Sequence, residues 1–271
     1  MADPLEWLKP PCAMGVLNLT PDSFSDGARF AAPAAALGHL RAMAADGAAV
    51  CDVGAESTRP GAEPVAEEEE MRRLEATLAV LREEGPPVPL SIDTSKVRVA
   101  EAALDAGFVM VNDVTAGRAE PEILGLVAER GAAVCLVHMR GDPRTMQDDP
   151  RYADVVGEVG EFLAERLDAA GAAGVPAARV LLDPGIGFGK TVEHNLALLR
   201  GLPALAELGR PLVIGVSRKG FLGRLTGRDV ADRLAGSLAA GLAAVARGAA
   251  VLRVHEVRET VDALRVWTAV G

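Results

Sequence analysis

Short apolar runs alternate with longer amphipathic segments along the whole chain. Apolar runs that end in glycine, proline or a polar residue are typical of strands buried on both faces, as in a parallel sheet. We predict eight such strands, at residues 13–19, 49–54, 89–93, 110–114, 133–139, 180–183, 212–216 and 251–254.

The segments between these runs have the spacing of helices that cover a core. In the clearest one, Met71, Leu74, Leu78 and Leu81 fall on one helical face. Four glutamates at 67–70 precede this face, and acidic residues favour the positive end of the helix dipole. We therefore expect this acidic run to be a solvated helix start.

About eight strand–helix units in 271 residues indicate an α/β fold, a closed (β/α)₈ TIM barrel. An open, doubly wound sheet is the competing architecture. The units are fairly evenly spaced, and neither a linker nor a shift in composition marks a boundary. We therefore predict a single domain over residues 1–271 and prefer the barrel.

The charge balance argues against two classes of partner. The 38 acidic residues outnumber the 28 basic ones, which gives a net charge of −10. Nucleic acids and anionic membrane surfaces need basic patches, so we expect neither as a partner. Cys12, Cys51 and Cys135 each lie in an apolar run and none belongs to a CxxC motif. Buried, reduced thiols in a cytoplasmic protein are the prediction.

Polar residues stand at the carboxyl ends of the predicted strands, which is where barrel enzymes place their active sites. Asp93, Asn112, Asp183 and Lys219 follow the third, fourth, sixth and seventh strands. Because the strands of a closed barrel end on one rim, we expect these four side chains to converge.

Each of these residues also has a structural interpretation. Asp183 precedes a Pro-Gly turn and could cap that turn through its own backbone. Lys219 and Arg253 could instead form salt bridges with the aspartates. The salt-bridge interpretation leaves Asn18 and His255 unexplained, so we favour a binding site.

The chemistry of this set matches a flat heterocycle that carries a diphosphate. Two carboxylates and a carboxamide can bind the amino and ring N–H groups of a guanine-like or pterin ring, and Lys219 can donate to the ring carbonyl. Arg253 and His255 alternate along the last strand, so both should point the same way. Such a cationic pair would suit a phosphate or pyrophosphate.

Two other patterns carry less weight. Residues 185–191 resemble the end of a phosphate-binding loop, but Pro184 stands where that motif has its first glycine. We predict a tight strand-to-helix turn that serves as a pocket wall. The sequence has no HExxH motif and no Cys/His cluster, so a tightly held zinc ion is not expected.

Taken together, the motifs resemble the dihydropteroate synthase family of pterin-binding enzymes. The matching segments are 14–27, 56–61, Asp93, Asn112-Asp113, 138–147, 183–190, 217–219 and 253–255. They cover nearly the whole chain in the order and spacing of the family. The resemblance implies a folate-biosynthesis transferase that joins 6-hydroxymethyl-7,8-dihydropterin diphosphate to p-aminobenzoate and releases pyrophosphate and 7,8-dihydropteroate.

The resemblance also implies roles for individual residues. The set that matches the pterin-binding residues is Asp93, Asn112, Asp183 and Lys219. Arg253 and His255 match the pyrophosphate pocket, and Asn18 matches the residue that helps to hold Mg²⁺.

Further matches concern the second substrate. Thr58 and Arg59 match the second mobile loop of the family. Phe188, Lys219 and Pro60 resemble parts of the p-aminobenzoate pocket, where sulfonamides compete. Gly220 follows Lys219 where many members have serine, so backbone N–H groups or the start of the next helix would hold the carboxylate of p-aminobenzoate.

The implied mechanism uses no side-chain nucleophile. Pyrophosphate departs with Mg²⁺ into the pocket of Arg253 and His255, and Asp93 stabilises the pterin methylene cation that remains. The residues implied in catalysis are Asp93, Lys219, Arg253 and His255. Two alternatives stay open, a barrel like the methyltetrahydrofolate:corrinoid methyltransferases and a pterin-binding protein without catalysis. The family also implies a homodimer formed through the late helices.

Overall fold

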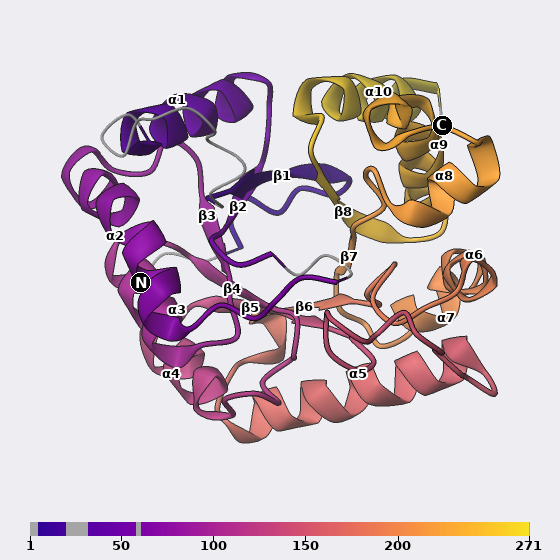
Figure 1. Ribbon diagram of the computed structural model, residues 1–271, viewed down its shortest axis with the longest axis horizontal. Coiled ribbons are helices and arrows are strands. Elements are labelled where there is room, and N and C mark those ends of the chain that lie inside the picture. Colours follow the sequence, from indigo (N-terminus) through magenta and orange to yellow (C-terminus); the bar gives the residue numbers. More distant parts are fainter. Residues whose placement is uncertain (1–4, 20–31, 58–60, 271) are drawn as a thin grey trace.

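Eight parallel strands form a closed ring at the centre of the protein, as predicted (Figure 1). This computed structural model describes residues 5–19, 32–57 and 61–270. The strands are β1 (Cys12–Asn18), β2 (Val50–Gly54), β3 (Leu90–Asp93), β4 (Met110–Asp113), β5 (Ala133–Val137), β6 (Val180–Asp183), β7 (Leu212–Ile214) and β8 (Ala249–Val254). Every predicted strand is present. The open-sheet alternative is wrong, because β8 pairs with β1 and closes the ring.

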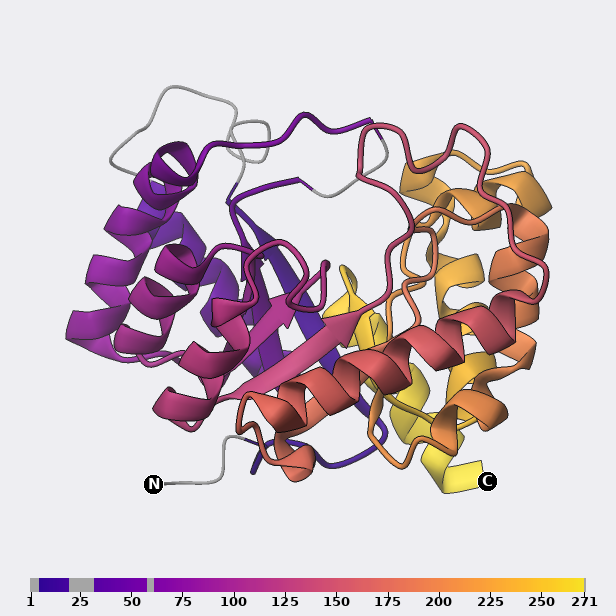
Figure 2. The same cartoon turned by 90° about the horizontal axis from the view of Figure 1, so that it is seen from below.

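Helices surround this ring and follow one another in chain order (Figure 1). They are α1 (Ala32–Ala45), α2 (Glu67–Glu84), α3 (Val97–Asp105), α4 (Glu122–Arg130), α5 (Val155–Ala172), α6 (Val192–Arg200), α7 (Leu202–Ala206), α8 (Gly220–Thr226), α9 (Leu234–Val245) and α10 (Val257–Val270). Short 3₁₀ turns η2 (Ala177–Arg179) and η3 (Val230–Asp232) precede β6 and α9. The view turned by 90° shows α5 lying across the outside of the barrel (Figure 2).

The inside of the barrel has an apolar layer below a polar one. The lower layer includes the buried residues Met14, Val50, Met110, Leu181 and Val251. Side chains of a strand alternate between its two faces, so the next inward position lies two residues further along. Those positions hold Asp52 in β2, Asn112 in β4, Asp183 in β6 and Arg253 in β8. The strand period therefore places polar groups at the carboxyl end of the core.

Helix α2 confirms the predicted apolar face and corrects the predicted helix start. Leu74, Leu78 and Leu81 are buried against the barrel. Glu70 is also fully buried, although we expected the acidic run to be solvated. Lys96, the residue before α3, places its Nζ 2.5 Å from Glu70 Oε2 and makes this burial possible. The spacing of residues in the sequence did not predict the pairing of Glu70 with Lys96, because Lys96 belongs to the next strand–helix unit.

The three cysteines are buried and unpaired, as predicted. Burial raises the pKa of Cys12 to about 11 and that of Cys51 to about 12, so both thiols stay neutral at physiological pH. Within the described part of the chain, none of the helices combines the length and the apolar character needed to cross a bilayer.

Candidate active site

A small pocket at the carboxyl ends of the strands collects the predicted polar residues. Its lining consists of Asp93, Asn112, Val114, Val137, Asp183, Ile186, Phe188, Gly215, Lys219 and Arg253. Residues from five strands and three following turns therefore meet on one rim. The four strand-end residues expected to converge all line this pocket, and Arg253 lies with them.

Arg253 forms an ion pair with two carboxylates inside the barrel. Its Nε donates to Asp52 Oδ2 and its Nη2 donates to Asp93 Oδ2, each over 2.7 Å. This is the salt bridge that we considered as the structural alternative for Arg253. Burial raises the pKa of Asp93 to about 7, although the charge of Arg253 opposes that rise. The neighbouring carboxylate of Asp52 adds to this rise in the pKa of Asp93.

Asp52 is a buried residue next to the pocket that the sequence analysis did not select. Besides Arg253, its Oδ2 accepts a hydrogen bond from Asn112 Nδ2 over 2.9 Å. The available signal was a single charged residue in the otherwise apolar strand β2. A buried charge is costly unless it is paired, so its position alone predicted a partner.

Asp183 caps its own turn, as one interpretation predicted, and also lies in the pocket. Its Oδ1 accepts a hydrogen bond from the backbone N–H of Gly185 over 2.7 Å, which caps the turn. The same carboxylate lines the pocket. Burial raises the pKa of Asp183, while the Gly185 N–H and the charge of Lys219 act in the opposite direction.

The turn after β6 forms a wall of the pocket, as predicted. The Lys219 ammonium lies 4.1 Å from the centre of the Phe188 ring, a cation–π contact that joins two walls. In the same turn, Lys190 Nζ donates to Phe188 O over 3.0 Å and lies 2.9 Å from His138 Nδ1. Burial lowers the pKa of Lys190 to about 7. Lys190 and His138 thus fix the turn that presents Phe188.

Gly185 is the tightest point of this turn. Its φ is +69°, and a Cβ there would lie 1.8 Å from His138 O. Gly209 has nearly the same φ, +68°, but no atom within 4 Å of such a Cβ. We expect Gly209→Ala to cost about 1 kcal/mol in the free energy of unfolding, from the left-handed backbone alone.

Gly185→Ala is expected to cost several-fold more than this matched control and to lower activity, because the turn has to move away from His138. Urea denaturation of both variants, together with an activity assay, measures the two effects. Equal losses of stability would contradict the steric argument.

The other predicted residues lie around the pocket or outside the described part. The Nδ1 atom of His255 lies 2.9 Å from Ser217 Oγ, at the end of β8 beside the turn after β7. Asn18 ends β1 and stands opposite Gly54 of β2. Thr58, Arg59 and Pro60 fall outside the residues that the structure describes.

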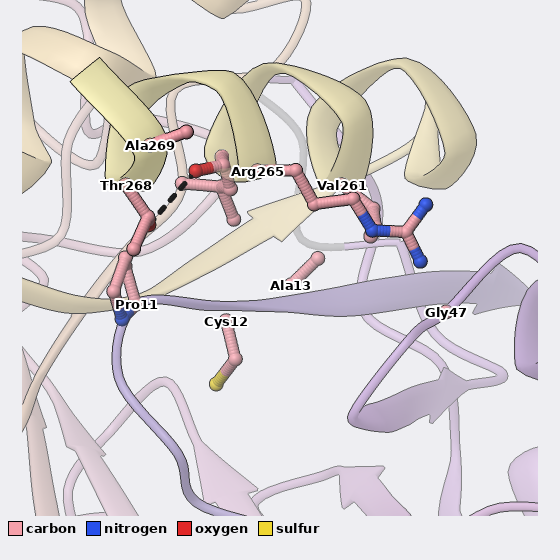
Figure 3. A pocket seen from close by; sticks show the side chains of 9 residues that line it. Pro11, Cys12, Ala13, Gly47, Val261, Arg265, Thr268 and Ala269 are labelled. Atoms are coloured by element: carbon pink, nitrogen blue, oxygen red, sulfur yellow. Dashed lines mark hydrogen bonds between the residues drawn. The ribbon is translucent and has the colours of Figure 1, made fainter.

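A larger hollow of about 410 Å³ lies at the opposite end of the barrel, between β1 and α10 (Figure 3). Pro11, Cys12 and Ala13 contribute to one side of it. Arg265 is the one charged residue in its lining, and that guanidinium pairs with Asp262 over 3.3 Å. Without convergent polar groups this hollow offers nothing to orient a polar substrate. The smaller pocket is therefore the candidate active site.

Fold and site together define a (β/α)₈ barrel whose rim pocket presents carboxylates, a carboxamide and cations to a small polar ligand. Residues 14–255 match the family model described as pterin binding enzyme. The chain therefore belongs to the pterin-binding enzyme family.

Its relatives within that family are dihydropteroate synthases. The enzyme of Neisseria meningitidis serogroup B is 48% identical over 270 residues, which cover 97% of this chain and 94% of that protein. The enzyme of Xanthomonas albilineans with 4-aminobenzoic acid has 49% identity and a TM-score of 0.89, covering 97% of this chain and 94% of that one. The complex of the Xanthomonas albilineans enzyme with 7,8-dihydropteroate has 46% identity and a TM-score of 0.86, and the match covers 97% of this chain and 94% of that one.

Proposed function

We propose that the protein is a transferase that joins 6-hydroxymethyl-7,8-dihydropterin diphosphate to p-aminobenzoate and releases pyrophosphate and 7,8-dihydropteroate. Relatives at this level of identity are named for this activity, and one of them was solved with 7,8-dihydropteroate. The observation that carries the proposal is the convergence of Asp93, Asn112, Asp183 and Lys219 in one pocket.

These four side chains would bind the pterin ring by its edge. Asp93 and Asp183 supply acceptors for ring N–H and amino groups, and Asn112 supplies a carboxamide beside them. Lys219 would donate to the ring carbonyl or the adjacent ring nitrogen. Its contact with Phe188 keeps the ammonium at the pocket wall, next to where p-aminobenzoate would enter.

Arg253, His255 and Asn18 would serve the diphosphate. Arg253 contacts Asp93 from the adjacent edge of the pocket, so a diphosphate on the pterin methylene group would compete for its guanidinium. Mg²⁺ binds oxygen ligands and usually keeps substrate phosphates and waters among them, and the carboxamide oxygen of Asn18 would add one protein oxygen. When bound, Mg²⁺ would neutralise charge on the departing pyrophosphate.

Departure of pyrophosphate would leave a pterin methylene cation, which the weakly basic amine of p-aminobenzoate attacks. Asp93 would stabilise that cation through its negative charge, the kind of preorganised electrostatic effect that dominates many enzymatic reactions. No side chain needs to form a covalent bond. Thr58 and Arg59, with Phe188, would complete the site for the amine.

A direct assay tests the proposal. The protein is mixed with the pterin diphosphate, p-aminobenzoate and Mg²⁺, and pyrophosphate is measured with and without the amine. Release that depends on the amine supports the synthase. Tight pterin binding without release would instead support a pterin-binding protein, and transfer of a methyl group from methyltetrahydrofolate to a corrinoid would support the methyltransferase alternative.

Pterin binding should weaken as the pH falls. Asp93 accepts ring N–H groups best as a carboxylate, and burial raises its pKa to about 7. The ionised fraction therefore falls as the pH drops through 7, and affinity for 6-hydroxymethylpterin should fall up to about tenfold from pH 8 to pH 6. This probe lacks phosphate groups, so their titration does not enter. Calorimetry with Asp93→Asn should show a flat profile; an unchanged slope would point to another group.

We further propose a homodimer that forms through the late helices. Leu225 in α8, Val230 in η3 and Leu234 at the start of α9 are 56%, 55% and 36% exposed, although they are large and apolar. Light scattering should give twice the chain mass, and Leu225→Glu should lower it. Ala76→Glu, at an exposed position of α2 away from the late helices, is the control and should leave the mass unchanged.

A cytoplasmic location is part of the same proposal. The three buried, unpaired thiols fit a reducing compartment. Fractionation of cells that express the protein would test this, and recovery with periplasmic or membrane markers would contradict it.

A further inference from the structure

The proposed function leaves one acid of the pocket region without a role. Asp52 is fully buried in the middle of β2. Its Oδ2 accepts two hydrogen bonds, from Asn112 Nδ2 over 2.9 Å and from Arg253 Nε over 2.7 Å. Its Oδ1 is buried and has no hydrogen-bond partner among the described residues. Asp52 thus connects two residues that we assign to different parts of the substrate, one to the ring and one to the diphosphate.

The contact with Asp52 decides which way round the Asn112 carboxamide lies. A carboxylate can only accept hydrogen bonds, so the amino group of Asn112 has to face Asp52 Oδ2. The reversed amide would place two oxygens about 3 Å apart in a buried site, which is strongly unfavourable. The carbonyl oxygen of Asn112 is consequently turned away from Asp52, and it is buried and without a partner in the described residues.

An unpartnered buried oxygen beside a pocket is an acceptor that a ligand can satisfy. Leaving such an oxygen unpaired costs more than a typical hydrogen bond contributes, so the pocket favours a ligand with an N–H group at that point. A ligand with a hydrogen-bond acceptor at that point would place its lone pair against the carbonyl oxygen of Asn112, which is repulsive. The orientation of Asn112 therefore discriminates between ring edges, and Asp52 sets that orientation.

We propose that Asp52 is a positioning residue that fixes Asn112 as a hydrogen-bond acceptor toward the ring and holds Arg253 beside it. Asp52 itself does not line the pocket and so acts through its two partners. Its bond to Arg253 Nε leaves the Nη2 edge to Asp93, so the guanidinium keeps one anchor when Asp93 turns to the substrate. The inference rests on the proposed function and specifies how its pocket selects the ring.

The test combines substitutions at the two positions. Asn112→Asp in the natural background places a second carboxylate against Asp52, and the repulsion between the two like charges should weaken binding of 6-hydroxymethylpterin by about ten- to a hundredfold. Asp52→Ala frees the amide of Asn112 to reverse and should weaken binding by a similar factor. A carboxylate at 112 presents an oxygen whichever way it lies. The double variant D52A/N112D should therefore bind the pterin more tightly than either single variant.

Two further variants separate positioning from general stability. Asp52→Asn keeps an oxygen for both donors, so binding should stay within about threefold of the natural protein. Ser91, the partner of Asp52 in the β2–β3 register, is buried and its Oγ has no hydrogen-bond partner in the described residues. Ser91→Ala should change neither binding nor turnover.

Calorimetric titration with 6-hydroxymethylpterin gives the affinities, and thermal unfolding shows that each variant is folded. The double variant carries the same number of carboxylates as the natural protein, so its comparison with Asn112→Asp remains valid even if Asp52→Ala does not fold. Additive losses in the double variant would overturn the positioning role. The amine-dependent release of pyrophosphate by the natural protein is measured alongside. If this release is absent, the proposed function fails. If it is present and the losses of affinity are additive, only the inference about Asp52 fails.

Discussion

Asp93→Asn is expected to reduce turnover by about two to three orders of magnitude while weakening pterin affinity by no more than about tenfold. Asparagine keeps an oxygen that can accept a hydrogen bond from the ring, so much of the binding remains. It removes the negative charge that would stabilise the pterin methylene cation. The expected signature is therefore a fall in kcat that far exceeds the change in affinity.

Steady-state kinetics of amine-dependent pyrophosphate release, combined with calorimetric binding of 6-hydroxymethylpterin, measure the two effects. Asp113→Asn is the neighbouring control, because the Asp113 side chain accepts backbone N–H bonds from Thr115 and Gly117 and does not line the pocket. Equal losses of binding and turnover in Asp93→Asn would contradict the charge-stabilising role.

Arg253→Met should lower the free energy of unfolding by about 3–5 kcal/mol and abolish measurable turnover. The substitution leaves the carboxylates of Asp52 and Asp93 buried without the guanidinium that bonds to both. Removing one partner from such a group is more damaging than replacing the whole group with apolar residues, because the remaining charges stay unpaired. Turnover is lost because the same guanidinium is proposed to receive the pyrophosphate.

The stability loss in Arg253→Met should depend on pH. Burial raises the pKa of Asp93, and the charge of Arg253 opposes that rise in the natural protein. Without Arg253 the pKa of Asp93 in the folded state rises further above its ordinary value, so between pH 6 and pH 8 the free energy of unfolding falls more steeply than in the natural protein. Urea denaturation at pH 6 and pH 8 should show the larger deficit at pH 8.

Arg265→Met provides the matched control for this substitution. Arg265 forms an exposed pair with Asp262, and such pairs contribute about 0–1 kcal/mol. A small, pH-independent loss in Arg253→Met, similar to that of the control, would show that the buried carboxylates do not depend on Arg253.

The sequence alone determined the strands, their order and the rim on which the chemistry lies. Buried parallel strands appear as apolar runs with clear turn signals, because both faces must exclude water. Eight such runs that alternate with helices favoured a barrel over an open sheet, and in the barrel strand-end residues such as Asp183 and Lys219 line one pocket. The motifs also sufficed to indicate the family.

Only the tertiary structure decided which of these polar residues contact one another. Arg253 bonds to Asp52 and Asp93, residues 201 and 160 positions away along the chain. The buried contact between Lys96 and Glu70 likewise joins two different strand–helix units. Such pairs depend on the register between strands and on closure of the ring, which the local pattern of apolar residues does not encode. A charged residue within an apolar strand predicts that it has a partner, and the folded barrel determines which residue that partner is.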